Sequence, residues 1–156
     1  MNLFGLMETS GSAMQAERMR AEVVAANMAN AETTRTAAGG PYRRQEVVFA
    51  ANRGDAGFLD SMSTATGGIA AQNLLGTGNV APGVHVAQVV TDPTPPLKRY
   101  DPGHPDADAQ GYVSYPDINP LTEMVDLMGA TRAYGLNGSA VQAEKSMIVA
   151  ALDIAK

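Results

Sequence analysis

Apolar residues in the last stretch of the chain recur at alternating steps of three and four. The pattern runs from Met124 to Ala155 and is that of the a and d positions of a coiled-coil seam, with one row at 124, 131, 138 and 145 and the other at 127, 134, 141 and 148. The seam is imperfect, because Thr131, Gly138 and Lys145 interrupt it. Asn119 can serve as the N-cap, and Pro120 can occupy the first helical position, where a missing N–H costs nothing. We therefore predict a single helix over residues 120–156, with a length of roughly 54 Å at 1.5 Å per residue.

Two faces of this predicted helix are apolar, which is typical of a helix that contacts several neighbours. A row of small residues at steps of four would let another backbone come close; it consists of Thr131, Gly135, Ser139 and Ala143. The alternative is a plain amphipathic helix packed within one monomer. We expect contacts between subunits at Met124, Leu127, Met128, Tyr134, Gly135, Val141, Ile148 and Leu152.

A second helix is predicted within residues 1–31, where apolar residues again follow steps of four and three. Gly5 and Gly11 weaken its first turns, so regular helix is expected to begin near residues 9–10. It should end near Asn30, because Asn tolerates the left-handed conformation found at helix ends. The two terminal helices have complementary patterns and can pair as an antiparallel coiled coil. On the N-terminal helix, the expected subunit contacts are Met14, Val24 and Met28.

Between the helices, the pattern changes to short alternating segments that are typical of β-strands. Strands are predicted at 42–50, 84–90, 97–100 and 111–115, with turns imposed by proline between them. Residues 32–41 have the composition of a linker.

Gly, Ala, Ser and Thr dominate residues 53–83, which we expect to form a long loop or mobile insertion. Met62, Ile69, Leu74 and Leu75 could form a short helix or hairpin within it. The predicted fold class is therefore α+β. Residues 1–31 and 120–156 would form a coiled-coil stem, and residues 32–119 a small β-rich middle module.

Composition excludes several function classes. The net charge is −5 and the Lys and Arg residues are scattered, which argues against nucleic-acid binding and against anionic membrane surfaces. The chain has no cysteine, so disulfides, thiol catalysis and Cys-based zinc sites are excluded. Apolar runs are far shorter than the roughly 18 residues of a membrane span, so no direct membrane insertion is expected. The N-terminus lacks the basic and apolar regions of a cleaved secretory signal.

Candidate chemistry is sparse. His85 and His104 have no catalytic partners that the sequence can place near them. Residues 106–111 imitate the first half of a calcium-binding loop, but the twelfth position is Asp117 instead of Glu. We therefore expect no enzyme activity, no cofactor and no metal. A calcium-binding or hydrolytic protein is the weakest alternative.

Two terminal motifs resemble those of the bacterial flagellar basal-body rod and hook protein family. The N-terminal motif comprises Ser10, Gly11, Ala26, Asn27, Ala29 and Asn30. The C-terminal one comprises residues 123–128 and 130–134, and residues 98–105, 111–113 and 116–119 resemble the proximal rod members. Asn27 and Asn30 share a helix face, and could cap the helix and bond the backbone that follows, or simply face water.

The resemblance implies a structural subunit of the proximal rod, which assembles through its terminal helices into a torque-transmitting drive shaft across the periplasm. It implies partners of the FlgB, FlgF and FlgG types, an FliE-type ring adaptor, and export by the flagellar type III apparatus without a cleaved signal. Another rod subunit of the same family is one alternative. A cytoplasmic coiled-coil scaffold or adaptor is a second.

Overall fold

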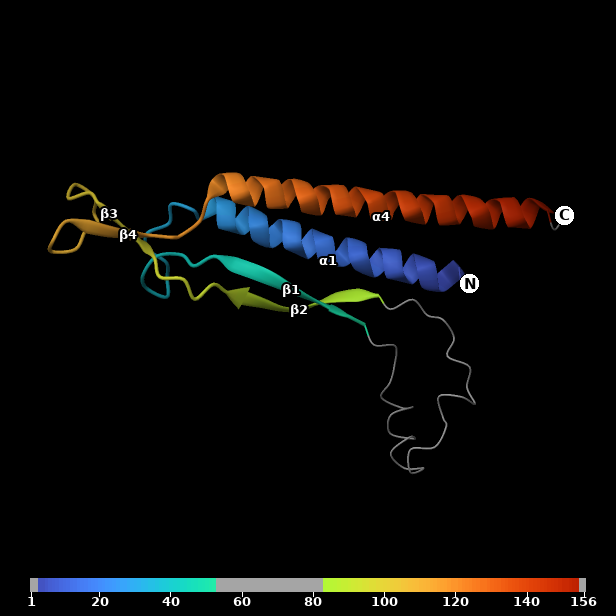
Figure 1. The fold of residues 1–156 in the computed structure, drawn as a ribbon, viewed down its shortest axis with the longest axis horizontal. Coiled ribbons are helices and arrows are strands. Elements are labelled where there is room, and N and C mark those ends of the chain that lie inside the picture. Colours follow the sequence, from blue (N-terminus) through green and yellow to red (C-terminus); the bar gives the residue numbers. More distant parts are fainter. Residues whose placement is uncertain (1–2, 53–82, 155–156) are drawn as a thin grey trace, which may run out of the picture. The chain divides into compact units, whose positions relative to one another are not determined.

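The computed structural model describes residues 3–52 and 83–154. A long helix stands at each end of the chain and short strands lie between them, so the fold is α+β as predicted (Figure 1). The elements are α1 (Leu3–Ala29), β1 (Gln45–Ala51), β2 (Val84–Thr91), β3 (Leu97–Tyr100), β4 (Tyr112–Tyr115) and α4 (Pro120–Ile154). The predicted insertion, with its short helix or hairpin, lies outside the described residues except for Gly83.

The chain divides into two compact units, and each contains part of both long helices. Among the described residues, the terminal unit comprises 3–16, 49–52, 83–85 and 135–154, and the central unit comprises Glu17–Val48 and Val86–Tyr134. The interactions below are given within one unit or the other.

Helix α1 begins earlier than predicted. It starts at Leu3 instead of near residues 9–10, so that part of the prediction is wrong. Each helical glycine costs about 1 kcal/mol relative to alanine, but extending an existing helix adds one hydrogen bond per residue and is favourable. Gly5 is also buried, and its carbonyl accepts a bond from the Thr9 hydroxyl at 2.8 Å. The end of α1 at Ala29 confirms the prediction of an end near Asn30.

Helix α4 begins as its sequence predicts. The Asn119 side-chain oxygen accepts a hydrogen bond from the Leu121 N–H at 3.0 Å, and the Asn119 carbonyl accepts one from the Glu123 N–H at 3.1 Å. Asn119 is thus the N-cap, and Pro120 is the first helical residue.

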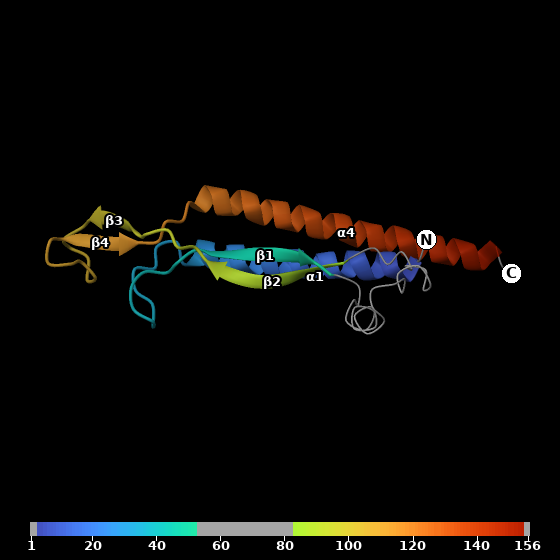
Figure 2. The same ribbon diagram turned by 60° about the horizontal axis from the view of Figure 1, so that its bottom comes forward.

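The four strands form two separate two-stranded sheets, β1–β2 and β3–β4 (Figure 2). β1 begins three residues later than predicted, because the Tyr42 N–H donates to the Thr33 carbonyl in the preceding loop instead of to a strand. β3 and β4 are antiparallel, with Leu97 opposite Tyr115 and Tyr100 opposite Tyr112.

In the terminal unit, α1 holds the start of β2 through one hydroxyl. The Ser12 hydroxyl oxygen accepts a hydrogen bond from the Val84 N–H at 3.1 Å. A Cβ at Gly83 would lie 2.7 Å from that hydroxyl oxygen, so a side chain there would displace the Ser12 hydroxyl from its bond with Val84.

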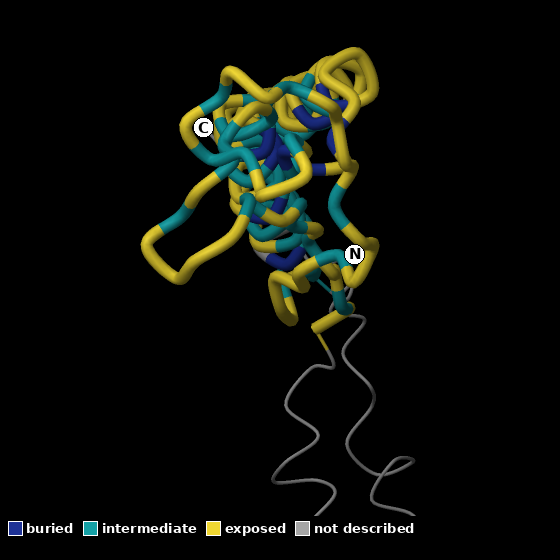
Figure 3. The backbone as a smooth tube through the Cα atoms, turned by 90° about the vertical axis from the view of Figure 1, so that its left-hand side faces the viewer, coloured by how far each residue is buried: buried dark blue, intermediate teal, exposed yellow. Residues whose placement is uncertain are grey.

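Hydrophobic burial within the chain is limited (Figure 3). Among the described residues, the buried hydrophobic side chains are Ala16, Val24, Val113, Ile118 and Ala130. Many larger apolar side chains are exposed, most of them on α4. In the part of the chain that the structure describes, neither long helix has a stretch apolar enough to cross a bilayer.

Candidate functional site

A cluster of polar side chains joins α1, the start of β1 and the start of α4 within the central unit. We call Asn27, Tyr42, Arg44 and Glu123 the polar cluster. Asn27 and Glu123 are each only 1% exposed, although both are polar. Buried polar groups are costly unless they are hydrogen-bonded, so the contacts of these two side chains decide whether the cluster stabilises the unit.

Asn27 uses its whole hydrogen-bonding capacity. Its amide nitrogen donates to the Glu123 carboxylate at 3.0 Å and to the Gln45 carbonyl at 2.9 Å. Its amide oxygen accepts from the Gln45 N–H at 2.9 Å and from the Tyr42 hydroxyl at 3.1 Å. Aspartate has no donors in its ionised form, so the position requires an amide.

Glu123 is the buried charge of the cluster, and Arg44 is its counterion. The Arg44 Nε donates to Glu123 Oε1 at 2.6 Å, while Asn27 satisfies Oε2. Arg44 also pairs with Glu46, and its guanidinium lies 3.7 Å from the Asp126 carboxylate. A buried ion pair is tolerated only with such additional partners.

Arg44 and Tyr42 keep the protonated forms that their hydrogen bonds need. Burial alone would lower the pKa of Arg44, but the Glu123 and Glu46 carboxylates outweigh it, and the pKa is raised. Burial, followed by the negative charge of Glu123, raises the pKa of the Tyr42 phenol. Arg44 is therefore charged and Tyr42 is a neutral donor at neutral pH.

A second set of ion pairs lies beside the cluster and is more exposed. Arg20 of α1 approaches Asp126 of α4 at 3.3 Å and Glu17 at 3.7 Å. Arg20 lies opposite Asp126, and the later Asn27 lies opposite the earlier Glu123, so α1 and α4 run antiparallel in the central unit. Exposed pairs of this kind contribute about 0–1 kcal/mol each.

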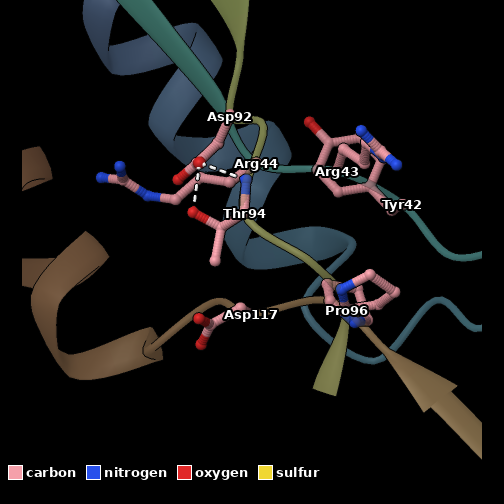
Figure 4. A pocket seen from close by; sticks show the side chains of 8 residues that line it. Tyr42, Arg43, Arg44, Asp92, Thr94, Pro96 and Asp117 are labelled. Atoms are coloured by element: carbon pink, nitrogen blue, oxygen red, sulfur yellow. Dashed lines mark hydrogen bonds between the residues drawn. The ribbon is translucent and has the colours of Figure 1, made fainter. Parts of the chain in front are cut away.

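A small hollow lies beside the cluster, and Figure 4 shows its lining. Its volume is about 10 Å³, and it is lined by Tyr42, Arg43, Arg44, Asp92, Thr94, Pro96, Pro116 and Asp117. The Asp92 carboxylate accepts bonds from the Thr94 hydroxyl at 2.5 Å and the Thr94 N–H at 2.8 Å, and these bonds lower its pKa. A hollow of this size is near the minimum for one water molecule, so it does not accommodate a substrate.

The segment that imitates a calcium loop holds the connection between β3 and β4. Asp108 Oδ1 accepts hydrogen bonds from the Tyr112 and Gln110 N–H groups, both at 2.9 Å, and the pKa of Asp108 is lowered chiefly by the bond from Tyr112. Asp106 accepts a bond from the Thr34 hydroxyl at 2.8 Å. Within residues 3–52 and 83–154, no group of three His, Cys, Asp or Glu side chains is close enough to hold a metal.

Helix α4 presents two different faces. The inner face comprises Glu123, Leu127, Ala130, Tyr134, Asn137, Val141, Glu144 and Ile148, and all of these except Tyr134 are buried or half-buried. It carries the carboxylates of Glu123 and Glu144 and the amide of Asn137, and its positions repeat every seven residues. Its row of 123, 130, 137 and 144 stands one position before the predicted row of 124, 131, 138 and 145.

The outer face of α4 comprises Leu121, Val125, Met128, Arg132, Leu136, Ser139, Ala143, Met147, Ala150 and Ile154, and all ten are exposed. Eight of these ten are apolar. The exposure of the large ones ranges from 52% at Met147 to 87% at Ile154. The more apolar face of α4 is thus the one that its own chain leaves open.

Two sequence models of protein families match the ends of the chain. The model described as flagella basal body rod protein matches residues 7–35, and the model described as flagellar basal body rod FlgEFG protein C-terminal matches residues 109–154. The flagellar basal-body rod protein FlgC of Bacillus subtilis is 38% identical, with 100% of both chains covered. FlgC of Borreliella burgdorferi is 37% identical and FlgC of Salmonella typhimurium 32%, each over 99% of this chain and 98% of the relative.

The chain belongs to the flagellar basal-body rod protein family. It is a structural rod subunit of the flagellar basal body, where it associates with other basal-body components. Asn27 lies in the N-terminal matched segment and Glu123 in the C-terminal one. In this rod protein, the polar cluster therefore joins the two segments that define the family.

The N-terminal motif of this rod protein has a structural role in the central unit. Asn27 bonds the backbone of β1, and the Asn30 amide donates to the Ala26 carbonyl at 2.9 Å, which caps α1. These are the two kinds of bond considered for the pair, and the water-facing alternative is wrong for Asn27. Ser10, Gly11, Ala26 and Asn30 are half-buried, and Ala29 is exposed.

The predicted interface residues of this rod protein fall into three groups. Val24 is buried within the chain. Half-buried positions are Met14, Met28, Leu127, Val141 and Ile148. Fully exposed positions are Met124, Met128, Tyr134, Gly135 and Leu152. Only the last group is open to another subunit without rearrangement.

Sequence reasoning missed the pairing of Arg44 with Glu123. Glu123 is in the first turn of α4, where a carboxylate is favourable for the helix dipole alone. Arg44 stands beside Arg43, and only Arg44 reaches the carboxylate. The one available signal was the position of Glu123 in a row of seven-residue spacing, 123, 130, 137 and 144. This row was not considered, because the predicted seam used the neighbouring row that begins at 124.

Proposed function

We propose that the chain is a subunit of the proximal rod and that it joins its neighbours through the outer face of α4. The observation that carries this proposal is the reversed polarity of α4, whose exposed face is more apolar than its buried face. A surface helix of a globular protein has the opposite arrangement, with its apolar face turned to the core and its polar face to water. Contiguous exposed apolar surface of this extent is typical of an interaction site.

The gain from covering this face is large. It carries six large apolar side chains: Leu121, Val125, Met128, Leu136, Met147 and Ile154. Fully burying one such side chain contributes about 1.5–3 kcal/mol, or roughly 9–18 kcal/mol for six before the cost of association. Neighbours in a closely packed rod could supply this burial.

The neighbours we propose are rod subunits of the FlgB, FlgF and FlgG types and an FliE-type ring adaptor. The C-terminal family model is described by the names FlgE, FlgF and FlgG and includes α4, which supports a shared type of helix among these proteins. We further propose that the rod crosses the periplasm as a drive shaft. The chain would reach it by flagellar type III export without a cleaved signal.

In this arrangement, residues 1–31 and 120–156 would form the core of the rod, and residues 32–119 would form a module attached to it. The proposed contacts at Met124, Met128, Tyr134, Gly135 and Leu152 require no change in the fold, because these residues are exposed. Met128 belongs to the outer face, and the other four would extend the contact beyond it. Leu127, Val141 and Ile148 are half-buried on the inner face of α4, so a neighbouring subunit would contact only the part of each side chain that stays exposed.

The test compares two methionines on the exposed faces of the two helices. Met128→Asp places a charge on the outer face of α4, and Met19→Asp places the same charge on α1, where Met19 is 43% exposed. Each variant replaces the chain in a flagellated host, and the chain is quantified in isolated basal bodies. We expect Met128→Asp to lower incorporation at least tenfold and Met19→Asp to leave it nearly unchanged.

Equal incorporation of the two variants would contradict the assembly role of the outer face. Absence of the unchanged chain from basal bodies would contradict the rod function itself and favour the scaffold alternative. Circular dichroism of both purified variants controls for folding, because the two substitutions carry the same helix-propensity cost.

A further inference from the structure

We draw no further inference here: the strongest candidate, the open hollow of about 510 Å³ between the loop at residues 34–41 and strand β4 in the central unit, carries nothing, because Asp106 and Asp108 on its wall already bond within the chain and nothing in the described residues shows which molecule would occupy it.

Discussion

Helices α1 and α4 are both long, yet their exposed faces have opposite character. The exposed positions of α1 include Glu8, Gln15, Arg18 and Glu22, and Arg18 pairs with Glu22 at 2.9 Å. On α4, by contrast, the exposed outer face carries large Leu, Val, Met and Ile side chains. The exposed face of α1 is adequately solvated by water, whereas that of α4 gains free energy from any apolar cover. The two terminal helices therefore offer different surfaces to other molecules.

The inner and outer faces of α4 also differ in polarity. In the central unit, two carboxylates of α4 contact other parts of the chain. Glu123 accepts hydrogen bonds from Arg44 and Asn27, and Asp126 pairs with Arg20. Polar contacts specify one register, because a shifted helix would leave the buried Glu123 without its partners. The apolar outer face tolerates more variation in its partner. The chain thus combines a specific internal contact with a largely apolar external one.

The largest expected effect breaks the polar contact between the helices. Glu123→Ala removes one carboxylate partner of the half-buried Arg44 and one partner of the buried Asn27. Loss of one member of a buried pair is strongly destabilising, and we expect a decrease of about 3 kcal/mol in the free energy of unfolding because Arg44 keeps Glu46 and Asp126. Urea denaturation measures it. Glu8→Ala, at an exposed position of α1, is the control, and an equal effect of both would contradict the role of the cluster.

The next prediction compares the two faces of α4 through the same change, leucine to alanine, at one position on each face. Leu127→Ala removes a half-buried side chain of the inner face and should lower the free energy of unfolding by about 1–2 kcal/mol. Leu136→Ala, on the outer face, should change it by less than about 0.5 kcal/mol. Both are measured by urea denaturation in dilute solution, where self-association does not contribute. A larger loss for Leu136→Ala would reverse the assignment of the faces.

A smaller effect on stability is expected at Tyr42, another member of the polar cluster. Tyr42→Phe removes the hydroxyl that donates to Asn27 and should cost about 0.5–1.5 kcal/mol at neutral pH. The Tyr42 pKa is raised above its ordinary value of 10.0 in the folded chain. Its contribution to stability is therefore fully present below pH 10 and is lost as the pH rises through the folded-state value.

The measurement is the difference in the free energy of unfolding between the wild type and Tyr42→Phe as a function of pH. Taking the difference cancels the titration of the other tyrosines. The difference should be constant up to about pH 9 and shrink above pH 10. A difference that grows with alkaline pH would contradict the assigned direction of the shift.

The smallest effect concerns the exposed face of α1. Arg18→Ala removes the exposed pair with Glu22, which stands four residues along the helix. Such pairs contribute about 0.3–0.5 kcal/mol, so the free energy of unfolding and the incorporation into basal bodies should both remain nearly unchanged. A strong loss of incorporation would mean that α1 also contacts a neighbour, and would weaken the contrast between the helices.

Local features were predictable from the sequence because their causes lie within a few residues. Asn119 and Pro120 define the start of α4 through bonds that reach only to Glu123. The end of α1 and the strands β2, β3 and β4 follow in the same way from capping, alternation and proline, whereas the pairing of β3 with β4 was not predicted. The early start of α1 was missed, because the local cost of Gly5 and Gly11 was considered without the gain from burial at Gly5.

The candidate site was only half predictable. Asn27 stood out by its motif and by its capacity for several hydrogen bonds, but its partners are 15, 18 and 96 residues away in the chain. Arg44 carries no local signal that separates it from Arg43. Pairings of this kind depend on which elements pack together, and no window of neighbouring residues contains that information.

Periodicity and capping are local properties of the chain, so the residues of α4 alone predict one long helix with more apolar surface than its own domain can cover. Which face of that helix turns inward depends on long-range contacts. Two faces of α4 satisfy helical spacing, and rows at 123 and 124 differ by a single position, or about 100° around the axis. The choice between them rests on the buried bonds of Glu123 with Arg44 and Asn27, which form only when three distant segments meet.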